Sequence, residues 1–110
     1  MSRHWSEWRL FPDPRTGDVL TAPIGPGCYE LKLRSNGELI LFGMAGNVAT
    51  RISSLLPKPF GCGTRNNSAK RDFVFEALGD IEYRTVATIS RFEAIELEGR
   101  FKKADYRFST

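Results

Sequence analysis

Two short apolar segments joined by Asn36-Gly37 constrain the fold of this chain more than any other feature. Over residues 28–33, apolar side chains that include Tyr29 alternate with charged ones at the two-residue period of a half-buried strand. A second apolar segment covers residues 39–43. Asn-Gly between two such segments is a strong hairpin signal because both residues tolerate positive φ. The chain should therefore contain an antiparallel β-hairpin.

Helix and strand signals continue after the hairpin. Asn47 is a good N-cap for a helix that reaches residue 56, since Pro57 follows. The later expected elements are a helix over residues 69–78 closed by Gly79 in a left-handed cap, a strand over 81–88, and a helix from 91 to about 104 that begins at a Ser90–Glu93 capping box. The order β-β-α-α-β-α predicts an α+β fold, in which a small three-stranded, mainly antiparallel β-sheet is flanked by about three helices.

Length and composition limit the class of protein. At 110 residues, 41% hydrophobic and 26% charged, the chain can form one hydrophobic core but hardly two. No apolar run approaches the ~18 residues of a membrane span, and no secretory signal is apparent, so a cytoplasmic location is expected. The expected division is an N-terminal arm over residues 1–26, which carries both tryptophans and packs on the core, and a domain over residues 27–110.

Positive charge is concentrated in two segments, residues 57–71 and 100–107. The net charge of +3 permits nucleic-acid binding without requiring it. A solvated surface is the plainer interpretation, and phosphate contact is the functional one. The candidate phosphate-binding residues are Lys58, Arg65, Lys70, Arg71, Lys102 and Lys103. Cys28 and Cys62 match no zinc or redox spacing, so both are expected to be free thiols.

Two charged residues occupy positions where helix periodicity favours apolar ones. Arg51 falls in a stripe with Val48 and Ile52, and Glu98 falls in a stripe with Ala94. Either the two form a partly buried salt bridge with each other, or they serve a function. Periodicity alone does not decide between these interpretations.

Four segments resemble the GIY-YIG nuclease family in order and spacing, over residues 27–108. They are Gly27-Cys28-Tyr29, Leu41-Phe42-Gly43, the segment from Asn47 to Arg51, and the segment from Ala94 to Glu98. The resemblance implies a metal-dependent DNA endonuclease that hydrolyses phosphodiester bonds. It implies Tyr29 as general base, Arg51 as phosphate-binding residue, and Glu98 as ligand of one Mg²⁺ or Mn²⁺ ion per site.

The chain departs from the family pattern at Leu41, where a second tyrosine is usual, and at Met44, where many members have lysine. These departures favour an alternative function, a catalytically weakened nucleic-acid-binding module of the same fold. A small protein-interaction domain that uses the aromatic arm is a further alternative. Because a nuclease of this size has little room for its own recognition domain, a homodimer or a separate targeting partner is also expected.

Overall fold

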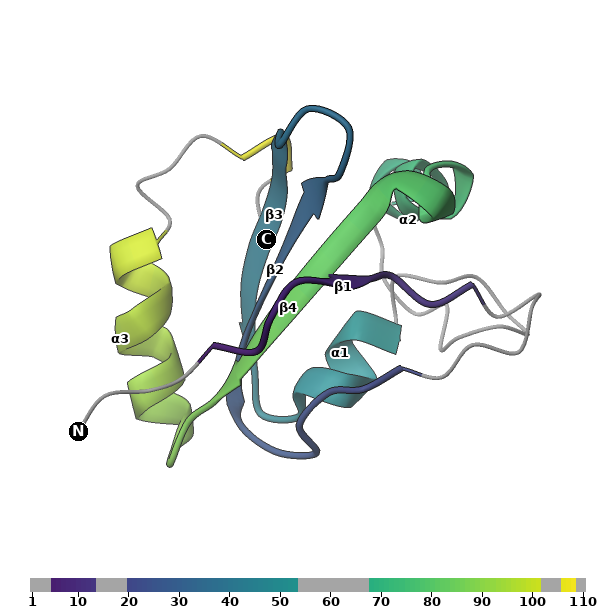
Figure 1. The fold of residues 1–110 in the computed structure, drawn as a ribbon. Coiled ribbons are helices and arrows are strands. Elements are labelled where there is room, and N and C mark those ends of the chain that lie inside the picture. The colour runs from purple at the N-terminus through teal and green to yellow at the C-terminus, as the bar shows by residue number, and fades with distance from the viewer. Residues whose placement is uncertain (1–4, 14–19, 54–67, 102–105, 109–110) are drawn as a thin grey trace.

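The computed structural model describes residues 5–13, 20–53, 68–101 and 106–108. In chain order the elements are β1 (Arg9–Leu10), β2 (Gly27–Leu33), β3 (Leu39–Ala45), α1 (Val48–Ser53), α2 (Ser68–Glu76), the 3-10 helix η2 (Leu78–Asp80), β4 (Ile81–Ala87) and α3 (Arg91–Phe101). Figure 1 shows the strands standing between α3 on one side and α1 and α2 on the other. In the part of the chain that the structure describes, no helix is long and apolar enough to cross a membrane.

The sheet is antiparallel throughout, with strand order β1-β4-β2-β3. The predicted hairpin is confirmed: Gly37 has a φ of 73°, and the Glu38 amide donates a hydrogen bond of 2.9 Å to the Asn36 side chain. The predicted α+β fold is also confirmed, but the described sheet has four strands instead of three. The additional strand, β1, has only two residues, which pair with Tyr83 and Glu82 of β4.

The helix caps follow the local sequence signals, with one exception. The Thr50 amide donates to the Asn47 side chain at 3.1 Å, and the Glu93 amide donates to the Ser90 hydroxyl at 3.2 Å. The left-handed cap expected at Gly79 is wrong. Among the described residues positive φ occurs only at Gly25 and Gly37, because α2 passes into β4 through the 3-10 helix η2. The predicted helix ends at residues 56 and 104 lie outside the described residues.

Two hydrophobic clusters cover the two faces of the sheet. Consecutive residues of a strand point to opposite faces, so Tyr29 and Leu31 of β2 enter one cluster while Cys28 enters the other. The buried members of the first cluster are Phe11, Tyr29, Leu31, Ile40, Leu41, Val48, Ile52, Val74, Leu78, Ile81 and Tyr83. The buried members of the second cluster are Cys28, Phe42, Val86 and Ala94. The first cluster thus includes α1 and α2, and the second includes α3.

Short segments near both ends of the chain lie along the outer strands. The amides of Ser6 and Phe11 each donate a hydrogen bond of 2.8 Å to backbone carbonyls of β4. At the opposite edge of the sheet, the amides of Arg107 and Phe108 donate hydrogen bonds to carbonyls of β3 at 3.1 and 2.9 Å. Residues 5–13 and 106–108 therefore pack on the sheet through backbone hydrogen bonds.

Candidate active site

Tyr29 lies on the central strand β2 and is fully buried. Its register partner on β3 is Gly43. A Cβ atom added to Gly43 would lie 2.5 Å from both Cζ and Oη of the tyrosine, so no side chain fits there without moving the ring. Because the hydroxyl is closed off from solvent in this structure, Tyr29 is placed less favourably for proton transfer to water than the sequence predicts.

Gly27, which begins β2, is also required by close packing. A Cβ atom at this position would collide with the carbonyl oxygen of Val86 and would lie 3.0 Å from Cγ2 of Val48. The absence of a side chain allows β2 to approach both β4 and α1. A side chain is therefore excluded at these two glycines for different reasons. At Gly27 it would collide with β4 and α1, and at Gly43 it would collide with the ring of Tyr29.

Arg51 lies on α1 and lines an open cleft at the end of β3. The cleft has a volume of about 330 Å³, and its lining residues are Met44, Ala45, Gly46, Asn47, Thr50, Arg51 and Arg91. The buried residues of α1 are Val48 and Ile52, whereas Arg51 is exposed. The expected place of Arg51 on the apolar stripe is therefore wrong, because this short helix buries only the side that contains Val48 and Ile52.

Glu98 lies on α3, partly exposed and one turn after the fully buried Ala94. The Cys28 thiol donates a hydrogen bond of 3.3 Å to the Ala94 carbonyl. Burial, and to a lesser extent the negative charge of Glu98, raises the pKa of this thiol to about 12. The charge of Glu98 thus affects the thiol of Cys28. Cys28 belongs to the cluster on one face of the sheet, and Tyr29 belongs to the cluster on the opposite face.

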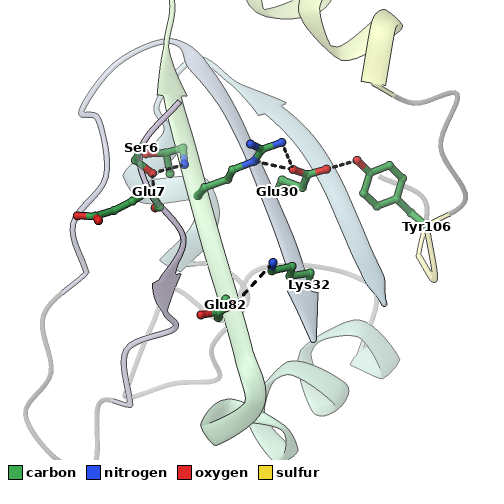
Figure 2. Close-up of polar contacts among 8 residues, drawn as sticks. Ser6, Glu7, Glu30, Lys32, Glu82 and Tyr106 are labelled. Atoms are coloured by element: carbon green, nitrogen blue, oxygen red, sulfur yellow. Dashed lines mark hydrogen bonds and ion pairs between the residues drawn. The ribbon is translucent and has the colours of Figure 1, made fainter. Parts of the chain in front are cut away.

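The sheet face that carries α3 also holds a buried carboxylate that the sequence pattern placed among solvent-facing residues. Glu30 is 3% exposed. Nε and Nη2 of Arg84, its partner on β4, both lie 2.7 Å from Oε1, and the Tyr106 hydroxyl donates to Oε2 (Figure 2). The Arg84 guanidinium also stacks over the rings of Trp5 and Trp8, at 4.4 and 4.8 Å from their centroids. This network joins the arm, the sheet and residues 106–108.

The structure thus does not place all of the predicted site residues in one cleft. Arg51 lines the cleft, and Arg91, the first residue of the helix that carries Glu98, lines it too. Tyr29 belongs to the buried cluster beneath α1 and α2. Of the predicted phosphate-binding residues, Lys70 and Arg71 lie in α2, and the following lie outside the described residues: Lys58, Arg65, Lys102 and Lys103. The residue that the sequence interpretation missed is Arg91, whose only sequence signal was a position next to the Ser90 cap.

The carboxylate of Glu98 is of a ligand type that a magnesium ion accepts. Within the described ranges, no group of three or more His, Cys, Asp or Glu side chains could hold a metal. Mg²⁺ does not require such a group, because it keeps several waters and commonly binds one or two carboxylates together with substrate phosphates. The partly exposed carboxylate of Glu98 meets that requirement, while the protonated thiol of Cys28 does not offer a ligand.

Comparisons with known proteins show what this chain is similar to. No family model matches the chain. The chain is 33% identical over 85 residues to UvrABC system protein C of Acidobacterium capsulatum, a match that covers 77% of this chain and 12% of the length of that relative. It is also similar to the crystal structure of the GIY-YIG N-terminal endonuclease domain of UvrC from Thermotoga maritima, bound to its catalytic divalent cation, magnesium. That likeness has a TM-score of 0.60 and 25% identity, and it covers 86% of this chain and 94% of the other.

Proposed function

Because the chain belongs to the GIY-YIG nuclease family, we propose that it is a metal-dependent endonuclease that hydrolyses phosphodiester bonds in DNA. The observation that carries this proposal is the cleft at the end of β3, where Arg51 is exposed and where the helix that bears Glu98 begins. An open cleft with cationic walls suits a polyanionic substrate. The proposal takes Arg51 as the group for phosphate binding and Glu98 as the group for one divalent ion.

Arg51 is proposed to bind the scissile phosphate. A guanidinium group is permanently charged and presents its donors in a planar fork, which matches two phosphate oxygens at once. Its exposed position on the cleft wall leaves room for a nucleic-acid strand. Hydrogen bonds to the phosphate oxygens strengthen as negative charge develops there, so Arg51 would bind the transition state more tightly than the ground state.

Glu98 is proposed as the protein ligand of one Mg²⁺ or Mn²⁺ ion. When bound, such an ion supplies Lewis-acid stabilisation of the charge that develops on the phosphate. Glu98 is suited to hold it because its carboxylate is partly exposed on a helix that packs on the sheet through Ala94. A rigid helix position limits the reach of the carboxylate and therefore fixes where the ion can bind.

Tyr29 is proposed as the general base that removes a proton from the attacking water. Its support is the match between the chain and the family at Gly27-Cys28-Tyr29, together with the room that Gly43 makes for its ring. The buried state of the ring sets a condition for this role: the hydroxyl must become accessible when substrate binds.

Nicking of supercoiled plasmid DNA in Mg²⁺ or Mn²⁺ tests the proposal. Arg51→Ala, Glu98→Gln and Tyr29→Phe should each reduce the nicking rate by about 100-fold or more, with the circular dichroism spectrum unchanged. Arg100→Ala is the matched control, because Arg100 is an exposed arginine of α3 that pairs with Glu96 at 3.6 Å and does not line the cleft. Its nicking rate should equal that of the natural chain, and EDTA should abolish nicking by both.

A catalytically weakened nucleic-acid-binding module is the second candidate, and two observations favour it. Leu41 is fully buried in the core, and Met44 puts an apolar side chain on the cleft wall. Absence of nicking by pure protein at every metal concentration, with DNA binding retained, would establish this second function instead of the first.

Whether a homodimer or a separate partner directs the chain to its target stays a prediction. Sedimentation with and without DNA can examine it.

A further inference from the structure

The cleft at the end of β3 contains a second arginine. Arg91 is the first residue of α3, and Arg51 belongs to α1, so the two guanidinium groups reach the same cleft from different helices. Both residues are exposed. The other described lining residues are Met44, Ala45, Gly46, Asn47 and Thr50, none of which carries a charge. The described lining therefore combines two cations with no carboxylate.

The position of Arg91 on α3 also relates it to Glu98. The two residues are seven positions apart, which is close to two helical turns, so they lie on the same side of α3 about 10 Å apart along its axis. A strand that contacts Arg91 in the cleft can therefore continue along the helix past the carboxylate of Glu98. Arg51 on α1 lines the same cleft as Arg91.

Two guanidinium groups on different helices suit a larger anionic ligand than one guanidinium group does. One arginine fork is sufficient to bind an isolated phosphate group. A second fork from another helix can in addition bind a second anionic group of the same ligand. The sugar-phosphate backbone of one nucleic-acid strand provides such groups in a regular series.

We propose that Arg91 is a second phosphate-binding residue of this cleft, and that together with Arg51 it binds neighbouring phosphates of one DNA strand. The inference rests on the proposed function, since it takes DNA as the ligand of the same cleft. It adds a residue to the cleft and predicts that a strand with consecutive phosphates binds more tightly than a single nucleotide does. Because Arg91 contacts the backbone, it contributes affinity without sequence preference.

The salt dependence of DNA binding tests this role. Fluorescence anisotropy with a labelled oligonucleotide, in EDTA so that no cleavage occurs, gives the dissociation constant over a range of salt concentrations. Arg91→Ala should weaken binding about tenfold and should reduce the slope of log K against log salt by roughly 0.7 to 0.9, the share of one phosphate contact. Arg91→Lys should retain the slope because it retains the charge. Arg100→Ala, on the same helix, should match the natural chain.

Equal slopes for Arg91→Ala and the natural chain would overturn the inference, and so would an equal loss of slope in Arg100→Ala. If Arg91→Ala fails to fold, as judged by circular dichroism, Arg91→Gln removes the same charge and decides the question. The binding assay also separates this inference from the endonuclease proposal. An Arg91-dependent slope without nicking would disprove only the nuclease, and nicking without an Arg91-dependent slope would disprove only the role of Arg91.

Discussion

The ring of Tyr29 lies over the bare Cα of Gly43, its partner across the β2–β3 pair. The tyrosine belongs to the first of the family-like triplets and the glycine to the second, so the hairpin brings the two triplets into direct contact. The glycine makes space for the aromatic ring. This contact explains in physical terms why both residue types occur at these two strand positions.

Gly43→Ala should therefore destabilise the protein. The added methyl group would lie 2.5 Å from Cζ and Oη of a fully buried ring, and overpacking of this kind costs about 1–3 kcal/mol. Urea denaturation measures the change in the free energy of unfolding. Gly99→Ala is the control, because Gly99 lies within α3 with open space around it, and alanine there should add about 0.5–1 kcal/mol of stability. Equal stability of Gly43→Ala and the natural chain would show that the ring lies elsewhere.

The buried pair of Glu30 and Arg84 should be strongly coupled. Arg84→Ala leaves the buried carboxylate of Glu30 without its cation, and such changes cost about 3–5 kcal/mol. A double-mutant cycle with Glu30→Ala isolates the interaction from the packing of Arg84 on the tryptophans. Lys32 and Glu82 provide the matched control on the same two strands. Their ion pair of 3.8 Å is more exposed and should give a coupling of less than about 1 kcal/mol.

Alkaline pH should weaken the folded state through Tyr106. Burial and the hydrogen bond to Glu30 raise the pKa of this phenol above its ordinary value of 10.0. From about pH 10 upward the unfolded chain therefore releases a proton that the folded chain retains, so the free energy of unfolding falls as pH rises. Tyr106→Phe should show a shallower fall, measured by urea denaturation at several pH values. Parallel curves for the variant and the natural chain would contradict this.

Cys28 should react slowly with thiol reagents while the chain is folded. Its thiol is fully buried, and its pKa is raised from the ordinary 9.0 to about 12, so very little thiolate exists near neutral pH. Iodoacetamide labelling followed by peptide mass spectrometry should modify Cys28 in denaturant and leave it intact under native conditions. Glu98→Gln removes only the lesser cause of the raised pKa, so native labelling should stay slow. Rapid native labelling of the natural chain would show that Cys28 is accessible.

Features that depend on neighbouring residues were predicted well from the sequence. The turn at Asn36-Gly37 and the caps at Asn47 and Ser90 follow from side-chain and backbone preferences within a few residues, and the structure confirms them. Gly79 shows the limit of such reasoning. A glycine after a helix permits a left-handed cap, but the path into the next strand decides whether one forms.

Features that depend on long-range packing were missed. Alternation along β2 placed Glu30 with the outward-facing residues, and only the positions of Arg84 and Tyr106 show that this part of the sheet is covered. Arg91 was not singled out, because only the fold brings the start of α3 to the same cleft as α1 and the end of β3. The resemblance to a family located Tyr29, Arg51 and Glu98, and their chemical roles stay predictions.

The backbone contacts made by residues 5–13 and 106–108 also affect how this chain meets copies of itself. An open edge strand presents unpaired amides and carbonyls, to which a strand from another molecule can add, and such addition leads to aggregation. Here the amides of Arg107 and Phe108 occupy the carbonyls of Leu39 and Ile40 on β3, and β1 together with the amides of Ser6 and Phe11 occupies β4. Strand addition at either place would first require these segments to detach from the sheet.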